Sequence, residues 1–206
     1  MERFVMRLLL VIAVFAALVL VLNFGYFWKQ AKFAFQKPQP LPIAEEQKPL
    51  VIEKSVVIVE SLGIKAPLQY VDEANEEVYQ KALQNGVVHY PGTAKPGEYG
   101  NVYIFGHSSD NAWSPGDYKT VFALLPHIEI GAKIVVSDQA GNPYEYTVIE
   151  AKVVGAKDTQ WLDQGEYKKK RLTLQTSYPI GTSLQRYVVI AEIPEDTTPS
   201  EDPNAS

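Results

Sequence analysis

A long apolar run close to the N-terminus constrains the fold of this chain more than any other feature of its sequence. Residues 8–22 contain no polar side chain, and mostly apolar and aromatic residues continue to Trp28. As an α-helix rising about 1.5 Å per residue, residues 8–28 would span about 30 Å, the thickness of the hydrocarbon core of a bilayer. Tyr26 and Trp28 fall where an aromatic belt would meet the lipid headgroups. We therefore predict an N-terminal membrane anchor at residues 1–28, with one transmembrane helix over about residues 8–28.

Two other interpretations of this run fit less well. A cleaved signal peptide has an apolar region of about 7–15 residues that ends in a small-x-small site, whereas the bulky residues Leu22, Phe24 and Tyr26 occupy this end. A helix of a soluble core is disfavoured because the run is apolar on every side. The orientation in the membrane stays open, because basic residues both precede and follow the run.

The rest of the chain divides by composition into a linker, one domain and a tail. Prolines concentrated in residues 37–49 favour an extended, semi-rigid spacer, so residues 29–49 are assigned to a proline-containing linker. Residues 50–194 are the predicted domain. Residues 195–206 are polar and acidic and are expected to be a disordered tail. Because no second apolar stretch follows, we expect the chain to cross the membrane once.

Short strands dominate the predicted domain. Stretches rich in Val, Ile, Tyr and Thr occur at residues 56–60, 101–105, 133–137, 144–154, 171–176 and 186–193. Gly141-Asn142, between two of these stretches, is a hairpin signal. One helix is predicted at residues 75–85, with Asn75 as its N-cap, and a second short helix at residues 121–125. Mostly short strands with one or two short helices indicate a mainly β fold, a closed or nearly closed β-barrel.

Cysteine content and charge exclude several functions. The 206 residues contain no cysteine, which rules out disulfide frameworks, zinc-thiolate sites, iron–sulfur clusters and a cysteine nucleophile. With a net charge of −5 and no basic face, the chain is not expected to bind nucleic acid. No stretch has the oxygen-ligand spacing of a known calcium loop, so we expect no cofactor.

Three polar residues stand at the ends of predicted strands. His107 follows a strand and a glycine, Ser177 follows the strand at residues 171–176, and Arg186 begins the next strand. If these ends converge, the hydroxyl, imidazole and guanidinium could serve as nucleophile, acid/base and oxyanion stabiliser. The same residues can also be a turn residue, a surface histidine and an exposed strand charge. The residues alone leave both interpretations open.

The sequence strings around these three residues together resemble the sortase family. Thr173-Leu174-Gln175-Thr176 matches the first four positions of the Thr-Leu-x-Thr-Cys strand end of sortases. Phe105-Gly106-His107 matches their histidine string, and Arg186 stands where they carry an arginine on the following strand. The resemblance covers most of residues 55–193 in order, and the anchor and spacer also fit. It implies a closed eight-stranded sortase-like β-barrel.

By this resemblance, the chain would be a transpeptidase of the cell surface. Sortases cleave a Leu-Pro-x-Thr-Gly-like sorting signal and transfer the product to an amine, such as a peptidoglycan precursor or a pilin lysine, and so attach surface proteins to the cell envelope. The resemblance implies that His107 is the acid/base and that Arg186 steadies substrate and oxyanion. It also implies a single-pass protein of the cell membrane with an extracytoplasmic domain. Some sortases bind calcium, which nothing in this sequence indicates.

The chain departs from the family at Ser177, which occupies the position of the nucleophilic cysteine. A serine hydroxyl is a much weaker acid than a thiol, whose pKa is about 8.5, and it needs a well-oriented base. Asp110 could orient His107, but more simply caps the loop at residues 113–115. We therefore predict little or no transpeptidation, whether Ser177 is natural or engineered. The alternative function is a non-catalytic pseudoenzyme that binds sorting signals or cell-wall components.

The remaining candidates have simpler structural interpretations. His89 precedes a Tyr-Pro-Gly turn and is interpreted as structural, and His127 is expected on a loop. The basic residues 168–171 are expected to form a solvated turn, with contact to anionic lipid or wall precursor as the alternative. Phe122 could line a substrate groove or pack in the core.

Overall fold

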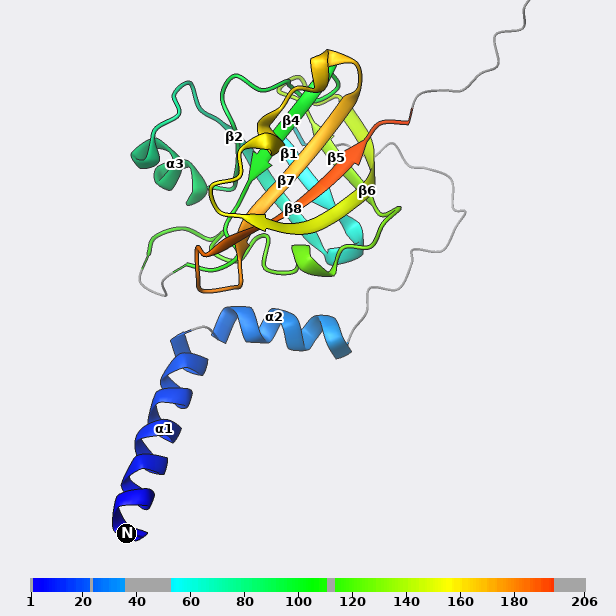
Figure 1. The fold of residues 1–206 in the computed structure, drawn as a ribbon. Helices are drawn as coiled ribbons and strands as arrows, with labels where there is room; N and C mark the ends of the chain where they lie inside the picture. The colour runs from blue at the N-terminus through cyan, green and yellow to red at the C-terminus, as the bar shows by residue number, and fades with distance from the viewer. Residues whose placement is uncertain (1, 23, 36–52, 111–113, 195–206) are drawn as a thin grey trace, which may run out of the picture.

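The computed structural model describes residues 2–22, 24–35, 53–110 and 114–194, which form N-terminal helices and a β-barrel (Figure 1). The α-helices are α1 (Glu2–Leu22), α2 (Phe24–Phe35) and α3 (Glu76–Leu83). The 3-10 helices are η1 (Glu60–Leu62), η2 (Leu125–His127), η3 (Gln160–Leu162) and η4 (Gly165–Tyr167). The strands are β1 (Val56–Val59), β2 (Ile64–Tyr70), β3 (Val87–His89), β4 (Gly100–Phe105), β5 (Lys133–Ser137), β6 (Pro143–Gly155), β7 (Lys170–Tyr178) and β8 (Gln185–Glu192).

The eight strands of the described residues close into one barrel in the order β1-β2-β3-β4-β7-β8-β6-β5. Strand β2 pairs with β3, and β4 with β7, in parallel, whereas the other neighbours are antiparallel. The predicted mainly β fold with a closed eight-stranded barrel is therefore confirmed. Closure pairs every strand on both sides, which removes the exposed sheet edges that would otherwise template aggregation.

All stretches predicted as strands form strands, but β2 and β3 were missed. Strand β2 contains Pro67, which cannot donate a ladder hydrogen bond and therefore argues against a strand in a sequence. Strand β3 is only three residues long and has no pattern of its own. The predicted hairpin is the β5–β6 connection, where the first pair is Ser137 with Pro143. Asp138 closes its loop by accepting hydrogen bonds from the backbone N–H groups of Ala140 and Asn142, both at 2.8 Å.

One of the two predicted short helices is confirmed. Helix α3 begins after Asn75, whose side-chain oxygen accepts a hydrogen bond from the N–H of Glu77 at 2.9 Å. The helix predicted at residues 121–125 is wrong, because residues 121–124 form turns and Leu125 begins η2. Their hydrogen bonds connect residues three apart, as from Ala123 N–H to the Thr120 carbonyl, and the N–H of Phe122 instead donates to the carbonyl of His107 at 2.9 Å.

The hydrophobic core fills the barrel interior. It consists mainly of β-branched and leucine side chains from the strands, with Tyr146 and Phe122 as its largest fully buried members. Phe122 is completely buried and packs within this cluster, so it belongs to the core and not to a groove. Every second side chain along a strand points into the barrel, and these side chains supply the rest of the core, as expected for a small barrel filled by side chains.

The N-terminal region forms two helices where the sequence predicted one. Residues Arg3–Val21 of α1 are long and apolar enough to cross a membrane, and none of them is buried within the protein. The single helix predicted over residues 8–28 is instead divided between α1 and α2, and α2 continues to Phe35. Residues 29–35, assigned to the linker, are therefore helical. The rest of the predicted linker, residues 36–49, and the predicted tail at residues 195–206 lie outside the described residues.

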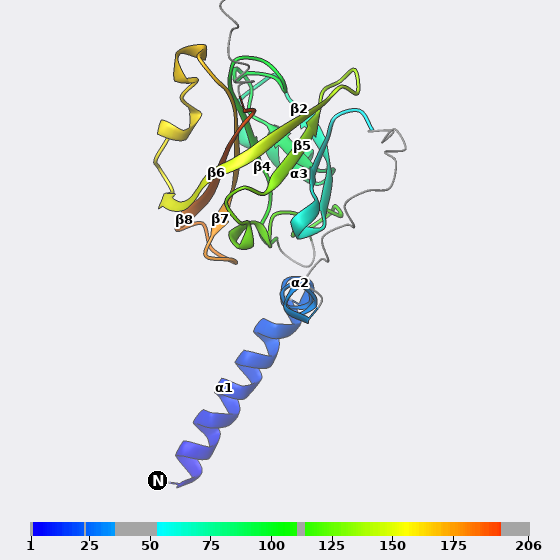
Figure 2. The same cartoon turned by 90° about the vertical axis from the view of Figure 1, so that its right-hand side faces the viewer.

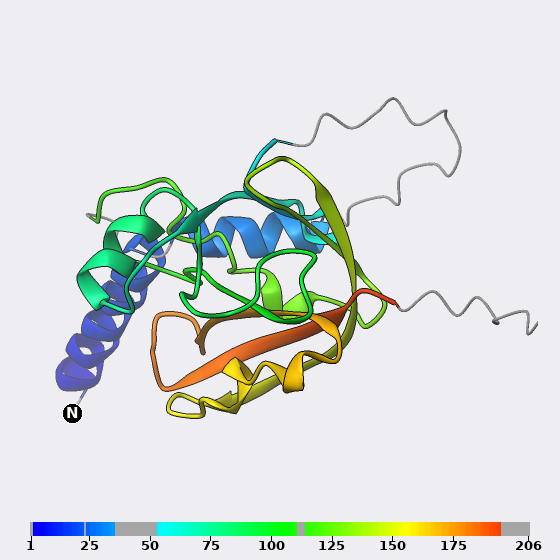
Figure 3. The same ribbon diagram turned by 90° about the horizontal axis from the view of Figure 1, so that it is seen from above.

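Helix α2 packs against one end of the barrel (Figures 1 and 2). The ammonium of Lys29 donates to the carbonyl of Thr120 at 2.8 Å, and the amide of Gln30 donates to the carbonyl of Ala123 at 3.3 Å. The side chain of Gln30 also lies 2.7 Å from the His127 ring nitrogen. Viewed from the opposite end, α2 passes beneath the barrel (Figure 3). This contact explains why the chain is helical here, since α2 has a surface to pack against.

Candidate active site

His107 is held just beyond the end of β4 by backbone hydrogen bonds and close packing. The N–H of Gly106 donates to the carbonyl of Gln175 at 3.1 Å, and the carbonyl of His107 accepts from Phe122 N–H. A Cβ atom on Gly106 would lie 2.8 Å from the Phe122 ring and 2.9 Å from Val87, closer than real Cβ contacts. Glycine is therefore required before the histidine because no other residue fits between these core side chains.

Ser177 lies beside His107 because β4 and β7 are neighbouring parallel strands. The last register pair of these strands is Phe105 with Gln175, so His107 and Ser177 each come two residues later. Parallel neighbours run about 4.8 Å apart and reach the same edge of the barrel together. The hydroxyl of Thr176 reinforces this junction, since it donates to the carbonyl of Gly106 at 2.8 Å.

Arg186 is paired directly with Ser177 across the β7–β8 hairpin. Residues opposite each other on antiparallel strands have Cβ atoms about 4.5–5.5 Å apart on one face of the sheet. The Arg186 guanidinium donates to the carbonyls of Ser183 and Gln185, both at 3.0 Å, which holds it over the β7–β8 turn. The pairing places Arg186 directly across from Ser177 on the neighbouring strand.

All three candidate residues line one pocket of about 370 Å³. The pocket also has walls from α3 and from the segment between β6 and β7, including Leu83, Asp158 and Leu162. The structure thus brings together three side chains that lie at most 79 positions apart along the chain, from His107 to Arg186. A larger hollow of about 400 Å³ lies between α2 and the barrel, but it contains none of the three.

Burial favours the neutral form of His107. Burial lowers the pKa of this half-buried imidazole, and the charges of Asp110 and Glu76 partly oppose the shift. A neutral imidazole can accept a proton at neutral pH. Asp110 accepts a hydrogen bond from the Ser114 hydroxyl at 3.0 Å, which agrees with its interpretation as a loop cap.

An aromatic wall of the pocket was missed by the sequence interpretation. Tyr79 of α3 lies 5.0 Å from the Phe105 ring and 6.0 Å from the Tyr90 ring, and Tyr90 contacts Tyr103 at 5.9 Å. The hydroxyl of Tyr103 donates to the side chain of Gln175. Burial raises the pKa of Tyr79 to about 12, so its phenol stays neutral. Tyr103 and Phe105 are two positions apart on β4 and so lie on one face of the strand, a pattern that the sequence already contains. Tyr79 and Tyr90 come from other elements and join them only through the fold.

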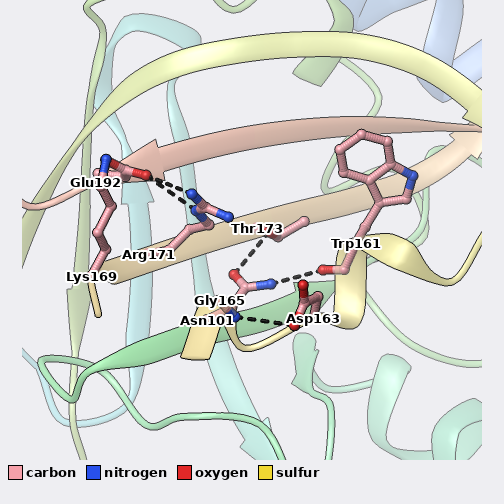
Figure 4. Close-up of polar contacts among 8 residues, drawn as sticks. All are labelled: Asn101, Trp161, Asp163, Gly165, Lys169, Arg171, Thr173 and Glu192. Atoms are coloured by element: carbon pink, nitrogen blue, oxygen red, sulfur yellow. Dashed lines mark hydrogen bonds and ion pairs between the residues drawn. The ribbon is translucent and has the colours of Figure 1, made fainter. Parts of the chain in front are cut away.

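Residues of the Thr-Leu-Gln-Thr string have structural roles beside the pocket (Figure 4). The buried hydroxyl of Thr173 donates to Asn101 Oδ1 at 2.9 Å, and Asn101 Nδ2 donates to the carbonyl of Trp161 at 2.7 Å. This chain of contacts ties the β6–β7 segment to strands β4 and β7. Leu174 is completely buried in the core. The string therefore positions the strand end that carries Ser177.

The basic residues 168–171 and the other histidines have structural partners. Arg171 and Lys169 both form ion pairs with Glu192 at 2.9 Å, as Figure 4 shows. The solvated turn predicted at residues 168–171 is wrong in part, because Lys170 and Arg171 already belong to β7. His89 is buried, and its ring nitrogen lies 2.8 Å from the Ala94 carbonyl. His127 contacts α2, with its ring 5.1 Å from that of Phe33. Within the described residues, no group of three His, Asp or Glu side chains could hold a metal ion.

A closed barrel with a hydroxyl, an imidazole and a guanidinium in one pocket defines a site suited to covalent acyl transfer. The chain belongs to the sortase family, a family of transpeptidases, because a model of the sortase domain matches residues 57–194. The chain is 25% identical to Sortase D of Bacillus subtilis (strain 168) over 173 residues, which cover 78% of this chain and 79% of that protein.

Solved structures of sortases share this fold. A Clostridium perfringens Sortase D5 transpeptidase is 24% identical, with a TM-score of 0.55 over 68% of this chain and 78% of that one. Sortase A from Corynebacterium diphtheriae, as a lid mutant, is 23% identical, with a TM-score of 0.56 over 83% of this chain and 81% of that one. At these identities the likeness concerns the fold alone.

Proposed function

We propose that this protein is a membrane-anchored, sortase-like transpeptidase that takes a Leu-Pro-x-Thr-Gly-like sorting signal into the pocket beside Ser177. The observation that carries the proposal is the pairing of Ser177 with Arg186 in the pocket that His107 also lines. The aromatic wall of Tyr79, Tyr90 and Phe105 offers apolar surface for the side chains of a bound peptide. The product would be a surface protein attached to the cell envelope.

Each residue has a defined role in the proposed reaction. The nucleophile at position 177 attacks the carbonyl carbon of the Thr–Gly bond, and its proton passes to His107. The C–N bond breaks as His107 returns the proton to the departing glycine amine, which leaves an acyl-enzyme. Arg186 stabilises the negative oxygen of the tetrahedral intermediate. An acceptor amine, of a peptidoglycan precursor or a pilin lysine, then attacks the acyl-enzyme and restores the nucleophile.

The reaction is expected to be slow with a serine at position 177. A cysteine beside an imidazole and a guanidinium can ionise near neutral pH, whereas a serine hydroxyl must lose its proton to a base during attack. The half-buried His107 has a lowered pKa and is therefore a weaker base for that purpose. The second candidate function, a non-catalytic protein that binds sorting signals or cell-wall components, is favoured by Ser177 itself.

The full chain and its Ser177→Cys and Ser177→Ala variants distinguish these two functions. Each is incubated with a sorting-signal peptide and an amine, and cleavage and acyl adducts are followed by mass spectrometry. We expect cleavage by Ser177→Cys only, with peptide binding retained by all three. A stoichiometric acyl adduct on Ser177 would show instead that the serine is competent. Failure of every form to bind the peptide would refute both functions.

The proposed location is the cell membrane, crossed once, with the barrel on the extracytoplasmic side. The apolar helix α1 supports the membrane attachment, and the family membership supports the side. Protease added to intact cells tests this location. Degradation of the barrel without lysis is expected, and protection of the barrel until lysis would contradict it.

A further inference from the structure

Helix α2 carries a continuous apolar stripe that the active site does not use. The stripe consists of residues three or four positions apart, which fall on one face of a helix. Its members are Phe24, Phe27, Trp28, Ala31 and Phe35. The exposed fractions of Phe24, Trp28 and Phe35 are 62%, 59% and 87%. Large exposed aromatic side chains gathered on one helix face indicate an interaction surface.

The opposite face of α2 is already occupied by the barrel. Lys29, Gln30 and Phe33 lie on that face, and they contact Thr120, Ala123 and His127 as described above. On a helical wheel this face lies roughly opposite the aromatic stripe. The stripe therefore points away from the barrel. Figure 2 views α2 end-on and shows the barrel on one side of α2, with α1 leading away on the other.

The position of α2 in the chain indicates what covers the stripe. Helix α1 ends at Leu22, and α2 begins at Phe24. Figures 1 and 2 show α1 leading away from the barrel, with α2 lying across the space between them. If α1 spans a bilayer, α2 emerges at its surface, where phenylalanine and tryptophan are favoured. Lys32, exposed at the flank of the stripe, would lie at the height of the headgroups.

We propose that α2 is an interfacial helix that joins the barrel to the lipid surface. Its stripe inserts at the boundary between headgroups and acyl chains of the membrane that α1 enters, while its other face holds the barrel. This inference rests on the membrane anchor of the proposed function. It adds that the barrel lies against the membrane in one orientation, and does not merely hang from a tether.

The orientation determines where the pocket stands. The turn between β7 and β8, which joins the strands of Ser177 and Arg186, lies at the end of the barrel that faces α2 (Figures 1 and 2). Leu184 in this turn has an exposed fraction of 73%. Docking through α2 would therefore keep the active-site end of the barrel close to the lipid surface, within reach of substrates held there.

The absence of cysteine makes a direct test possible, because single cysteines can be introduced without removing others. The full chain is prepared with Val14→Cys in α1, Ala31→Cys in the stripe, or Ala140→Cys in the β5–β6 loop. Each is spin-labelled and reconstituted into phosphatidylcholine and phosphatidylglycerol vesicles. The ratio of collision with oxygen to collision with a water-soluble nickel chelate measures the depth of each label. All three positions are exposed in the protein, so labelling does not disturb packing.

We expect a ratio at Ala31→Cys several-fold above that at Ala140→Cys and below that at Val14→Cys. An aqueous ratio at Ala31→Cys, with Val14→Cys deep in the bilayer, would overturn the interfacial helix and leave the anchor intact. An aqueous ratio at Val14→Cys would refute the anchor and this inference with it. Spin–spin broadening at Ala31→Cys would assign the stripe to a second copy of the chain and would also overturn the proposal.

Discussion

The buried contact between Thr173 and Asn101 gives the sharpest test of the structural role assigned to the Thr-Leu-Gln-Thr string. The exposed fractions of these residues are 1% and 2%, and the Thr173 hydroxyl donates to Asn101 Oδ1 at 2.9 Å. Thr173→Val keeps the shape of the side chain but removes the donor. The oxygen of Asn101 is then buried without that hydrogen bond, which costs about 1–3 kcal/mol.

The expected loss is measurable by thermal unfolding. In a domain of about 150 residues, 1 kcal/mol shifts the Tm by roughly 2–4 °C, so the Tm should fall by about 2–12 °C. Thr147→Val is the matched control, because its hydroxyl accepts from the exposed Lys133 ammonium, which water can solvate instead. We expect that control to change the free energy of unfolding by less than about 0.5 kcal/mol.

A second variant separates the hydrogen bond from packing. Thr173→Ser keeps the donor and loses one methyl group, for which about 0.8 kcal/mol is expected from lost apolar burial. The ranking of stability should therefore be the unchanged chain, then Thr173→Ser, then Thr173→Val. If Thr173→Val lowers the Tm no more than Thr147→Val does, the hydrogen bond to Asn101 does not hold the β6–β7 segment in place, and the argument is refuted.

Two further predictions concern the surroundings of His107. Gly106→Ala should destabilise the barrel by about 1–3 kcal/mol through overpacking against Phe122. In the Ser177→Cys background it should also slow peptide cleavage. An unchanged Tm would contradict the packing argument. The lowered pKa of His107 means that the unfolded chain binds its proton at higher pH than the folded chain does, so stability should fall as the pH drops below about 6.5, the ordinary value. NMR titration should place the titration midpoint of His107 below that of a free histidine. His107→Gln should reduce the loss of stability on acidification. A titration midpoint above 6.5 for His107 would exclude this effect of desolvation.

Much of the barrel could be predicted from local sequence pattern. Strands such as β5 and β8 are rich in β-branched residues, and Asn75 caps α3 as its position predicted. Strand β2 could not be predicted in the same way. Its residues include Pro67, and they are extended because β1 and β3 pair on either side of them. Pairing partners distant in the chain decide such a strand, and no local pattern encodes them.

The candidate site shows the same division. The sequence predicted His107, Ser177 and Arg186 as candidate residues from their residue types and from their places at the ends of predicted strands. The aromatic wall was not readable, because Tyr79 comes from a helix and Phe105 from a strand, and only packing of α3 beside β4 brings their rings to 5.0 Å.

The sequence by itself determined the apolar helix, the β-rich domain and the absence of any thiol, because these follow from side-chain chemistry and local periodicity. Only the tertiary structure decided that His107 and Ser177 line one pocket, because the parallel pairing of β4 with β7 joins segments about 70 residues apart. It likewise decided that the run after α1 forms a second helix, α2, with one face on the barrel. A helix face acquires its meaning from what it packs against, and that surface comes from elsewhere in the chain.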